Sequence, residues 1–302
     1  MLEKVNFELI RLAIALGGTA AAAYEDAKTS FIDDRVTMGM LAAGIILDIL
    51  TFDVNFIALS LGVSAVIFAV GYLAYKTGQL GGGDVLLFAG LQALLPVFPL
   101  TILPFVQSLY PAGVAQAVEF IAEMNLYPFF LSVFVASSLF AMLGSAVQYA
   151  LALRGKKLKP DLVPLAVIGG TGVIALGWIL NAFGLSLVQL GFVALVFLPG
   201  MFLVGFKKQL LAEVIVQRIP ISKIEDEDIL ATEAMPPGLL KKYSLGRVLT
   251  KKEVAKLRKI RAAGKMSSFP VYKNLPRFGP YILAGLVASL LFADLFIFLL
   301  LF

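Results

Sequence analysis

The sequence predicts an all-α integral membrane protein, a polytopic helical bundle of about eight transmembrane helices with a small cytoplasmic domain before the last helix. Three observations predict this class. Of the 302 residues, 60% are apolar and 15% are charged, with a strongly positive mean hydropathy, far outside the range of soluble domains. The apolar residues form runs of about 20, the helix length that crosses a hydrocarbon core of about 30 Å. Most of the charged residues lie between these runs.

Eight apolar segments are expected to cross the bilayer as helices. Pro96, Pro99 and Pro104 should bend or end the fourth, because proline cannot donate a backbone hydrogen bond. The first segment has neither a cationic leader nor a convincing small-residue cleavage site, so we expect a retained span and not a signal peptide. The segments lie near residues 6–24, 37–53, 56–75, 85–106, 127–153, 161–182, 187–206 and 279–301.

Lysines and arginines fall in alternate loops, which predicts the orientation. Loops that stay in the cytoplasm are enriched in both residues. The loops near 53–56, 107–126 and 183–187 contain no basic residue, so we expect them outside, together with both termini. Lys4 and Arg11 do not follow this pattern. The basic loops, expected inside, contain Lys28 and Arg35, then Lys76, then Arg154, Lys156, Lys157 and Lys159, then the segment after Lys207.

Residues 207–276 are the one long polar segment, and we expect them to form a small basic cytoplasmic domain. They hold most of the 25 basic residues and the acidic cluster Glu225–Asp228, and they are too few to bury a large core. Their basic surface could bind anionic lipid headgroups or a substrate, or could be merely solvated. This domain separates a transmembrane core at 1–206 from a C-terminal transmembrane helix at 277–302.

The chain has no cysteine and no histidine. This excludes thiol nucleophiles, disulfides, Ser-His and Cys-His catalysis, and the HExxH zinc site of intramembrane metalloproteases. Any chemistry must depend on carboxylates, hydroxyls, lysines or the backbone. No metal site and no cofactor are therefore expected.

Two aspartates stand at predicted membrane boundaries. Asp84 directly follows the glycines Gly81–Gly83 and opens the fourth span, while Asp26 ends the first. A carboxylate at a bilayer edge costs free energy unless it is paired, hydrated or used, and glycines let other backbone approach it closely. The predicted orientation places both acids at the cytoplasmic face. Asp48 and Asp294 fall toward the outer ends of their spans, where we expect an interfacial or pairing role.

The sequence Gly81-Gly82-Gly83-Asp84 resembles the GxGD motif of the type IV prepilin peptidases. The stretch from Asp26 to Asp34 resembles their other motif, an aspartate followed by a basic residue and an Ile-Pro-Asp or Ile-Pro-Asn turn. The similarity is greatest to the archaeal preflagellin and prepilin peptidases. It covers the first hundred residues well, and Leu275–Pro280 resembles the C-terminal segment of the family. The pair of spans at 161–206 has no counterpart in this resemblance and looks like an addition to the family pattern.

This resemblance implies a membrane aspartyl endopeptidase that cleaves the N-terminal leader, or class III signal peptide, of archaeal preflagellin and prepilin-like precursors at the cytoplasmic membrane face. It implies that Asp26 and Asp84 are the catalytic pair and that Gly81 and Gly83 shape the active-site loop. The expected partners are the precursors and the lipid bilayer, and no nucleic acid. Neither a cofactor nor a metal is implied.

The sequence departs from the family pattern at three places. Asp33 stands where proline usually follows Ile32, and Leu86 stands where a lysine often follows the second acid. Bacterial members carry a cysteine-rich insertion between their first two spans and methylate the new N-terminus. Here that loop is short and cysteine is absent, so no N-methyltransferase activity is expected.

Two close carboxyls can hydrolyse a peptide bond if one is ionised and the other protonated, a state that like charges enforce by sharing a proton. Glu25, Asp33 and Asp34 surround Asp26 in sequence. They are possible substrate-binding residues, since they would attract the lysine or arginine that typically precedes the cleaved bond in such leaders. The alternative is that they are solvated loop residues.

Two other functions remain as alternatives. A presenilin-like protease also has a GxGD motif, but its second acid directly follows tyrosine and a Pro-Ala-Leu motif lies near its C-terminus. Here Glu25 separates Tyr24 from Asp26, and no such tripeptide follows Gly279. A proton- or cation-coupled transporter could place two carboxylates likewise, but it would be expected to show internal repeats and acids near mid-bilayer. Neither feature is clear in the sequence.

Overall fold

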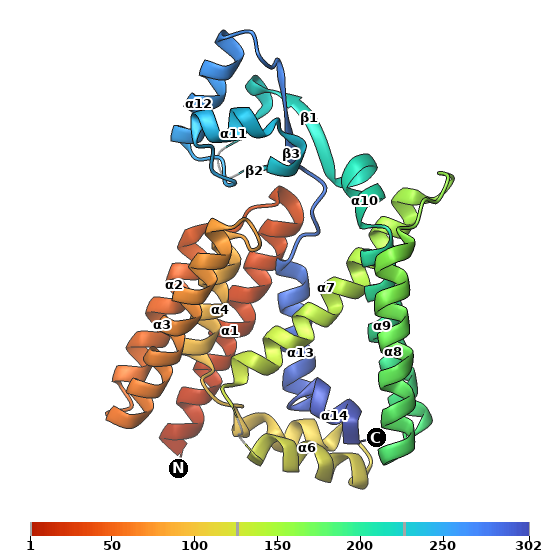
Figure 1. Ribbon diagram of the computed structural model, residues 1–302. Helices are drawn as coiled ribbons and strands as arrows, with labels where there is room; N and C mark the ends of the chain where they lie inside the picture. The colour runs from red at the N-terminus through yellow and green to blue at the C-terminus, as the bar shows by residue number, and fades with distance from the viewer. Residues whose placement is uncertain (1, 125–126, 226–227, 302) are drawn as a thin grey trace.

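The computed structural model describes residues 2–124, 127–225 and 228–301 (Figure 1). The protein is a polytopic membrane protein with a helical membrane part, which confirms the predicted class. In these ranges, five helices are long and apolar enough to cross a bilayer, and each coincides with a predicted span. They are α1 (Leu2–Thr29), α3 (Val54–Lys76), α7 (Phe129–Leu153), α8 (Leu162–Phe183) and α9 (Leu187–Gly205).

The other three predicted spans coincide with shorter helices. These are α2 (Asp34–Ile49), α4 (Gly82–Leu94) and α13 (Gly279–Phe292), followed by α14 (Leu295–Leu301). They contain 16, 13 and 14 residues, fewer than the roughly 20 that cross a bilayer as one straight helix. The effect expected of Pro96 and Pro99 is confirmed, because α4 ends before Pro96. Pro104 instead lies in the first turn of the next α-helix, α5 (Leu103–Ser108). The count of eight crossings stays a prediction.

An additional helix, α6 (Ala112–Met124), occupies the segment expected to be an outer loop. It buries Val118, Ile121 and Ala122, which recur at helical spacing on one face. That helix packs against α5 and α14. The expected loop is therefore partly a helix that closes this end of the protein.

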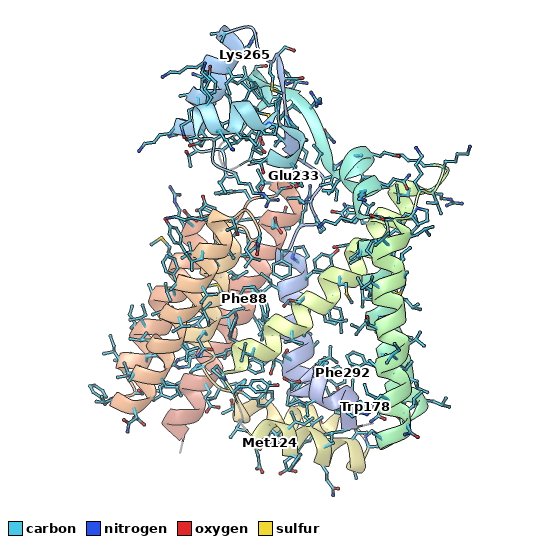
Figure 2. All side chains as sticks on the ribbon, viewed as in Figure 1. Phe88, Met124, Trp178, Glu233, Lys265 and Phe292 are labelled. Atoms are coloured by element: carbon cyan, nitrogen blue, oxygen red, sulfur yellow. The ribbon has the colours of Figure 1, made fainter. Side chains whose placement is uncertain are left out.

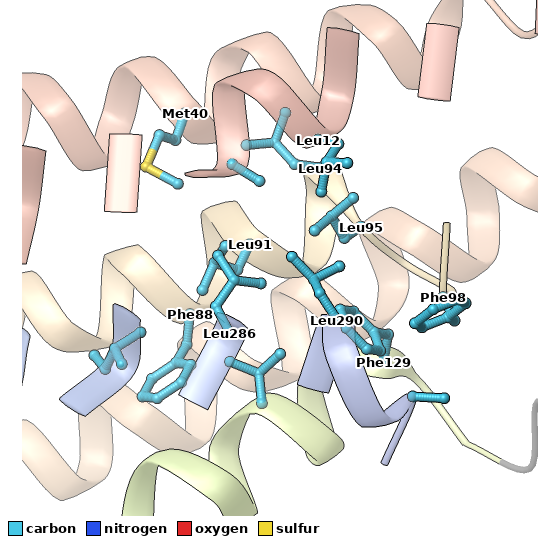
Figure 3. Close-up of a cluster of buried hydrophobic side chains, with 14 of the residues drawn as sticks. Leu12, Met40, Phe88, Leu91, Leu94, Leu95, Phe98, Phe129, Leu286 and Leu290 are labelled. Atoms are coloured by element: carbon cyan, nitrogen blue, oxygen red, sulfur yellow. The ribbon is translucent and has the colours of Figure 1, made fainter. Parts of the chain in front are cut away.

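Helices α1 to α4 form a bundle in which α4 packs against both α2 and α3. Small residues allow these close approaches. A β-carbon built on Gly44 would lie 2.6 Å from Ala93 Cβ, and one built on Gly71 would lie 2.5 Å from Val85 Cγ1. Figure 3 shows the apolar core, in which side chains of α13 join those of α1, α2 and α4: Leu12, Met40, Phe88, Leu91, Leu94, Leu286 and Leu290.

A buried ion pair joins α1 to α2. Arg11 Nη1 lies 2.7 Å from Asp48 Oδ1, and the two side chains are 5% and 0% exposed. The same nitrogen donates a hydrogen bond of 3.1 Å to the carbonyl oxygen of Ala93 on α4. The expected pairing role of Asp48 is confirmed. This pair also explains why Arg11 departs from the loop-charge pattern, since Arg11 lies inside a span and not in a loop.

Replacing Arg11 alone should destabilise the protein strongly. Arg11→Met leaves the Asp48 carboxylate buried without its cation, which we expect to lower the free energy of unfolding by about 3–5 kcal/mol. Adding Asp48→Leu should restore much of this loss, because no unpaired charge then remains. Unfolding in detergent measures the effect. Lys208→Ala is the control, because the ion pair of the exposed Lys208 side chain with Asp161 should contribute under about 1 kcal/mol.

The second half of the membrane part is built on α7, which packs against α13 and α9, while α8 packs against α9. Asp294 lies between α13 and α14. Its carboxyl accepts hydrogen bonds from the hydroxyls of Tyr127 and Ser132, and its Oδ1 accepts one of 2.8 Å from the N–H of Ile297. The expected pairing role of Asp294 is confirmed. This residue also caps the start of α14, after the break that interrupts the last predicted span.

Residues 216–272 form a separate unit, which we call the sheet domain. Its antiparallel strands β1 (Val216–Pro220), β2 (Ile229–Leu230) and β3 (Ser268–Tyr272) lie in the order β1-β3-β2. Helices α11 (Pro237–Tyr243) and α12 (Lys251–Ala262) cover them. The all-α class thus describes the membrane part only. The core of the domain contains Leu230, Leu249, Leu257, Ile260 and Phe269.

The sheet domain lies over one end of α1 to α4, whereas α1 begins and α14 ends at the opposite end (Figure 1). The preceding α10 (Lys207–Leu210) does not join the core of the domain. Leu210 and Ile215 pack instead with Tyr149 and Leu153 of α7. The predicted domain limits at 207 and 276 stay a prediction. Asp226 and Glu227 of the predicted acidic cluster lie outside the described residues.

Candidate active site

Asp26 lies in the last turn of α1 and is only 7% exposed. Its Oδ2 accepts a hydrogen bond of 2.8 Å from the backbone N–H of Gly279, at the start of α13. A β-carbon built on Gly279 would lie 3.0 Å from Asp26 Cβ and 3.3 Å from Ala23 Cα. Glycine at this position therefore allows the backbone of α13 to reach the carboxyl.

Asp84 lies half-buried in the first turn of α4, beside the positive end of the helix dipole. Its Oδ2 accepts a hydrogen bond of 3.3 Å from the N–H of Gly81. A β-carbon on Gly81 would lie 2.9 Å from this oxygen, and one on Gly83 would lie 2.9 Å from Ile32 Cβ. Both glycines of the predicted active-site loop thus occupy positions where a side chain would collide.

The structure brings Asp26 and Asp84 to the same end of the bundle, and their carboxyls interact electrostatically. Gly279 contacts Asp26, and the neighbouring Phe278 packs one helical turn from Asp84. The ring of Phe278 packs against that of Phe88, with centroids 5.9 Å apart, and Phe88 follows Asp84 by one helical turn on the same face of α4. Figure 2 shows Phe88 in the interior of the helical part. The two predicted catalytic aspartates therefore lie at one end of the bundle, where α1, α4 and the start of α13 meet.

Two of the three acids predicted near Asp26 have local structural partners. Glu25 Oε2 accepts a hydrogen bond of 3.0 Å from the N–H of Asp33. Asp33 is the N-cap of α2, and its Oδ1 accepts one of 2.9 Å from the N–H of Arg35. This cap gives a physical reason for an aspartate at a position where proline was expected. Asp34, in the first turn of α2, is the exposed member of the set.

Sequence reasoning did not assign a site role to the segment just before α13. Arg277 Nε donates a hydrogen bond of 3.1 Å to Ser30 Oγ, beyond the end of α1, and its charge acts on Asp26. The next two residues contact the site as described above, Phe278 through Phe88 and Gly279 through Asp26. The available signal was Gly279 followed by Pro280 at the start of an apolar run, a pattern typical of a helix start.

The site contains two carboxyls and backbone donors. Among the described residues, no group of three or more acidic side chains is placed to hold a metal ion. The expectation of a site without metal or cofactor stays a prediction. Two interacting carboxyls of this kind are suited to general acid–base chemistry, in which one carries the proton and the other is ionised.

Comparison with known proteins identifies this part of the chain. The model of the type IV leader peptidase family matches residues 13–145. Residues 13–145 are similar to the type IV leader peptidases. The matched stretch contains Asp26, Gly81, Gly83 and Asp84 and ends within α7. The resemblance that the two sequence motifs carry is thereby confirmed. Helices α8 and α9 and the sheet domain lie beyond the match.

Two curated archaeal proteins of this family are similar to the chain. Prepilin peptidase EppA of Methanothermobacter thermautotrophicus is 29% identical over 147 residues, which cover 47% of this chain and 35% of that protein. Preflagellin peptidase of Methanococcus voltae is 31% identical over 126 residues, which cover 40% of this chain and 51% of that protein. The chain thus spans about a third of one relative and about half of the other. No solved structure matches the chain.

Proposed function

We propose that the protein is a membrane aspartyl endopeptidase that removes the N-terminal leader, or class III signal peptide, from preflagellin- and prepilin-like precursors. One observation carries the proposal. Asp26 and Asp84 interact across the α1–α4 interface, inside the stretch that matches the type IV leader peptidases. The names of the two relatives, a prepilin peptidase and a preflagellin peptidase, indicate the class of substrate.

In the proposed reaction, the ionised carboxyl takes a proton from a water molecule, whose oxygen bonds to the carbonyl carbon of the scissile peptide. The protonated carboxyl donates its proton to the carbonyl oxygen. When the intermediate collapses, the C–N bond breaks and the leaving amine takes the proton that the first carboxyl gained from water. The second carboxyl takes back the proton from the former carbonyl oxygen, so both carboxyls return to their starting states. Hydrogen bonds from Gly279 and Gly81 to Asp26 and Asp84 hold the two carboxyls in orientation. We expect no methylation of the new N-terminus.

The proposed active site faces the cytoplasm, and both termini lie outside. The end of α1, the start of α4 and the sheet domain lie at the same end of the bundle (Figure 1), the end that carries the basic loops. Asp26 and Asp84 lie in these two helix turns. Because the chain has no cysteine, single cysteines can report the orientation. Lys265→Cys, at the far tip of the sheet domain (Figure 2), should react with an impermeant maleimide only after cells are opened. Asn55→Cys, exposed at the opposite end, should react in intact cells, and the reverse pattern would contradict this orientation.

Cleavage of a precursor tests the proposed function. Membranes that contain the protein, mixed with a tagged preflagellin or prepilin precursor, should convert it to one shorter product. Membranes without the protein should leave it intact. A panel of precursors that all stay intact would contradict the proposal and would turn attention to transport.

We propose that Glu25, Asp33 and Asp34 attract the basic residue near the cleaved bond, with Asp34 as the residue that contacts it. Asp34 is exposed, while Glu25 and Asp33 accept backbone hydrogen bonds. Asp34→Asn should therefore raise KM by about threefold, equivalent to less than about 1 kcal/mol, with kcat retained. Added salt should raise the KM of the wild type more than that of Asp34→Asn. Asp53→Asn, at the opposite end of the bundle, is the matched control, and equal salt sensitivity of wild type and Asp34→Asn would show that Asp34 is only solvated.

A further inference from the structure

The sheet domain rests on the turn that leads to Asp84. Helix α3 ends in a Schellman motif, in which Gly78 donates to the carbonyl oxygen of Tyr75 at 2.8 Å and Gln79 donates to that of Ala74 at 2.9 Å. Gly78 has a φ of +69°. A β-carbon built on it would lie 3.1 Å from Ile229 Cγ2 and 3.4 Å from Arg247 Cδ. Two side chains of the sheet domain therefore cover the turn three residues before Gly81.

Both covering residues are fixed by the sheet. Ile229 in β2 pairs with Tyr272 at the end of β3. The guanidinium of Arg247 lies over the Tyr272 ring, 5.5 Å from its centroid, and Nη2 donates a hydrogen bond of 3.3 Å to the phenolic oxygen. The carbonyl oxygen of Arg247 accepts one of 2.7 Å from Leu230. The contact with the turn is thus part of an ordered edge of the domain.

The same sheet leads to Asp26. Residues 273–279, which we call the connecting segment, join Tyr272 to Gly279, whose N–H binds the Asp26 carboxyl. This segment is bonded along its length to its surroundings. Its bonds join Lys273 to Ile215 (3.1 Å), Lys273 to Asp228 (2.7 Å), Asn274 to Val214 (2.8 Å), Asn274 to Tyr149 (3.1 Å) and Arg277 to Ser30 (3.1 Å).

We propose that the sheet domain sets the spacing of the two carboxyls, with Ile229 and Arg247 as positioning residues for the Gly81–Asp84 loop. This inference rests on the proposed peptidase function. Tyr272 is the common point, since it supports Arg247 on one side and begins the connecting segment to Asp26 on the other. Displacement of catalytic groups by about 1 Å can cost about 10²-fold in rate. A domain that packs on the turn before Asp84 and is joined by the connecting segment to Gly279 therefore controls turnover without touching the substrate.

The test compares purified full-length variants on one cleavable precursor. The double variant Ile229→Ala, Arg247→Ala removes the cover from the turn and should lower kcat at least tenfold while KM stays within about twofold. Arg247→Lys should keep most activity, because lysine retains the Cγ and Cδ that approach Gly78. Arg258→Ala, an exposed basic residue on α12, is the matched control and should behave as the wild type.

The pH profile separates positioning from a general loss of structure. Carboxyls that move apart share a proton less strongly, so the two limbs of the bell-shaped kcat profile should move closer together in the double variant. A smaller amount of folded enzyme would leave both limbs in place. Wild-type kcat and an unchanged profile in the double variant would overturn the positioning role. If the double variant does not fold, kcat and the pH profile are measured for Arg247→Ala instead. Wild-type values of both in that variant would overturn the proposal. Failure of the wild type itself to cleave would instead contradict the proposed function.

Discussion

Asp26→Asn and Asp84→Asn should each abolish precursor cleavage, with kcat reduced by roughly 10²–10⁴-fold or more. In the proposed reaction one carboxyl takes a proton from water and the other donates a proton to the carbonyl oxygen. The amide of asparagine can do neither, because it is too weak a base and too weak an acid. The wild type and the two variants are compared by their initial rates of cleavage of a single precursor, measured with purified protein in detergent.

The double variant Asp26→Asn, Asp84→Asn should be no less active than either single variant, because groups that act as a unit lose their effect together. Asp53→Asn controls for loss of a carboxylate elsewhere, since Asp53 caps α3 at the opposite end of the bundle. The two site variants must retain the unfolding temperature of the wild type. Cleavage at a wild-type rate by either single variant would remove that aspartate from the catalytic pair.

Gly279→Ala should have the second largest effect, a loss of about 10²-fold in kcat. Its methyl group would lie 3.0 Å from Asp26 Cβ, 3.1 Å from Asp26 Oδ2 and 3.3 Å from the Ala23 backbone. The backbone of α1 cannot move aside as a flexible side chain could, so the hydrogen bond from residue 279 to Asp26 must lengthen. Rates with the same precursor, at saturating and limiting concentrations, separate kcat from KM.

Gly62→Ala is the matched control for this substitution. Gly62 lies within α3, and a β-carbon built on it meets nothing within 4 Å. Alanine also favours a helix over glycine, so activity should be unchanged. A Gly279→Ala protein that is as active as Gly62→Ala would contradict the role assigned to the start of α13.

The membrane class and most helices could be predicted from the sequence because each depends on a local property, the length and polarity of an apolar run. The prolines likewise marked the end of α4. Such signals do not report which runs form helices too short to cross the bilayer alone, so they do not determine the number of spans. Strands β1 to β3 have five, two and five residues, too few for an alternating pattern to stand out against the polar segment around them.

The candidate site could be predicted only in part. Asp26 and Asp84 stand at membrane boundaries next to recognisable motifs, whereas Gly279 reaches Asp26 across 253 residues. That contact depends on how α13 packs against α1, which no local pattern encodes. Arg11 is a further case, since its partner Asp48 lies on another helix and the sequence showed only that Arg11 departs from the loop-charge pattern. The capping role of Asp33 and the long-range contacts of Arg277 emerge only from the folded chain.

The central claim is that Asp26 and Asp84 form a leader peptidase site, and product mass tests it most directly. Purified wild-type protein and the two Asn variants are incubated with one leader-bearing preflagellin or prepilin precursor, and both fragments are weighed. The account predicts a single cut at the end of the leader, a mature fragment without an added methyl group, and intact precursor with both variants. A cut that persists in either variant, or cuts scattered through the membrane segment of the substrate, would contradict it.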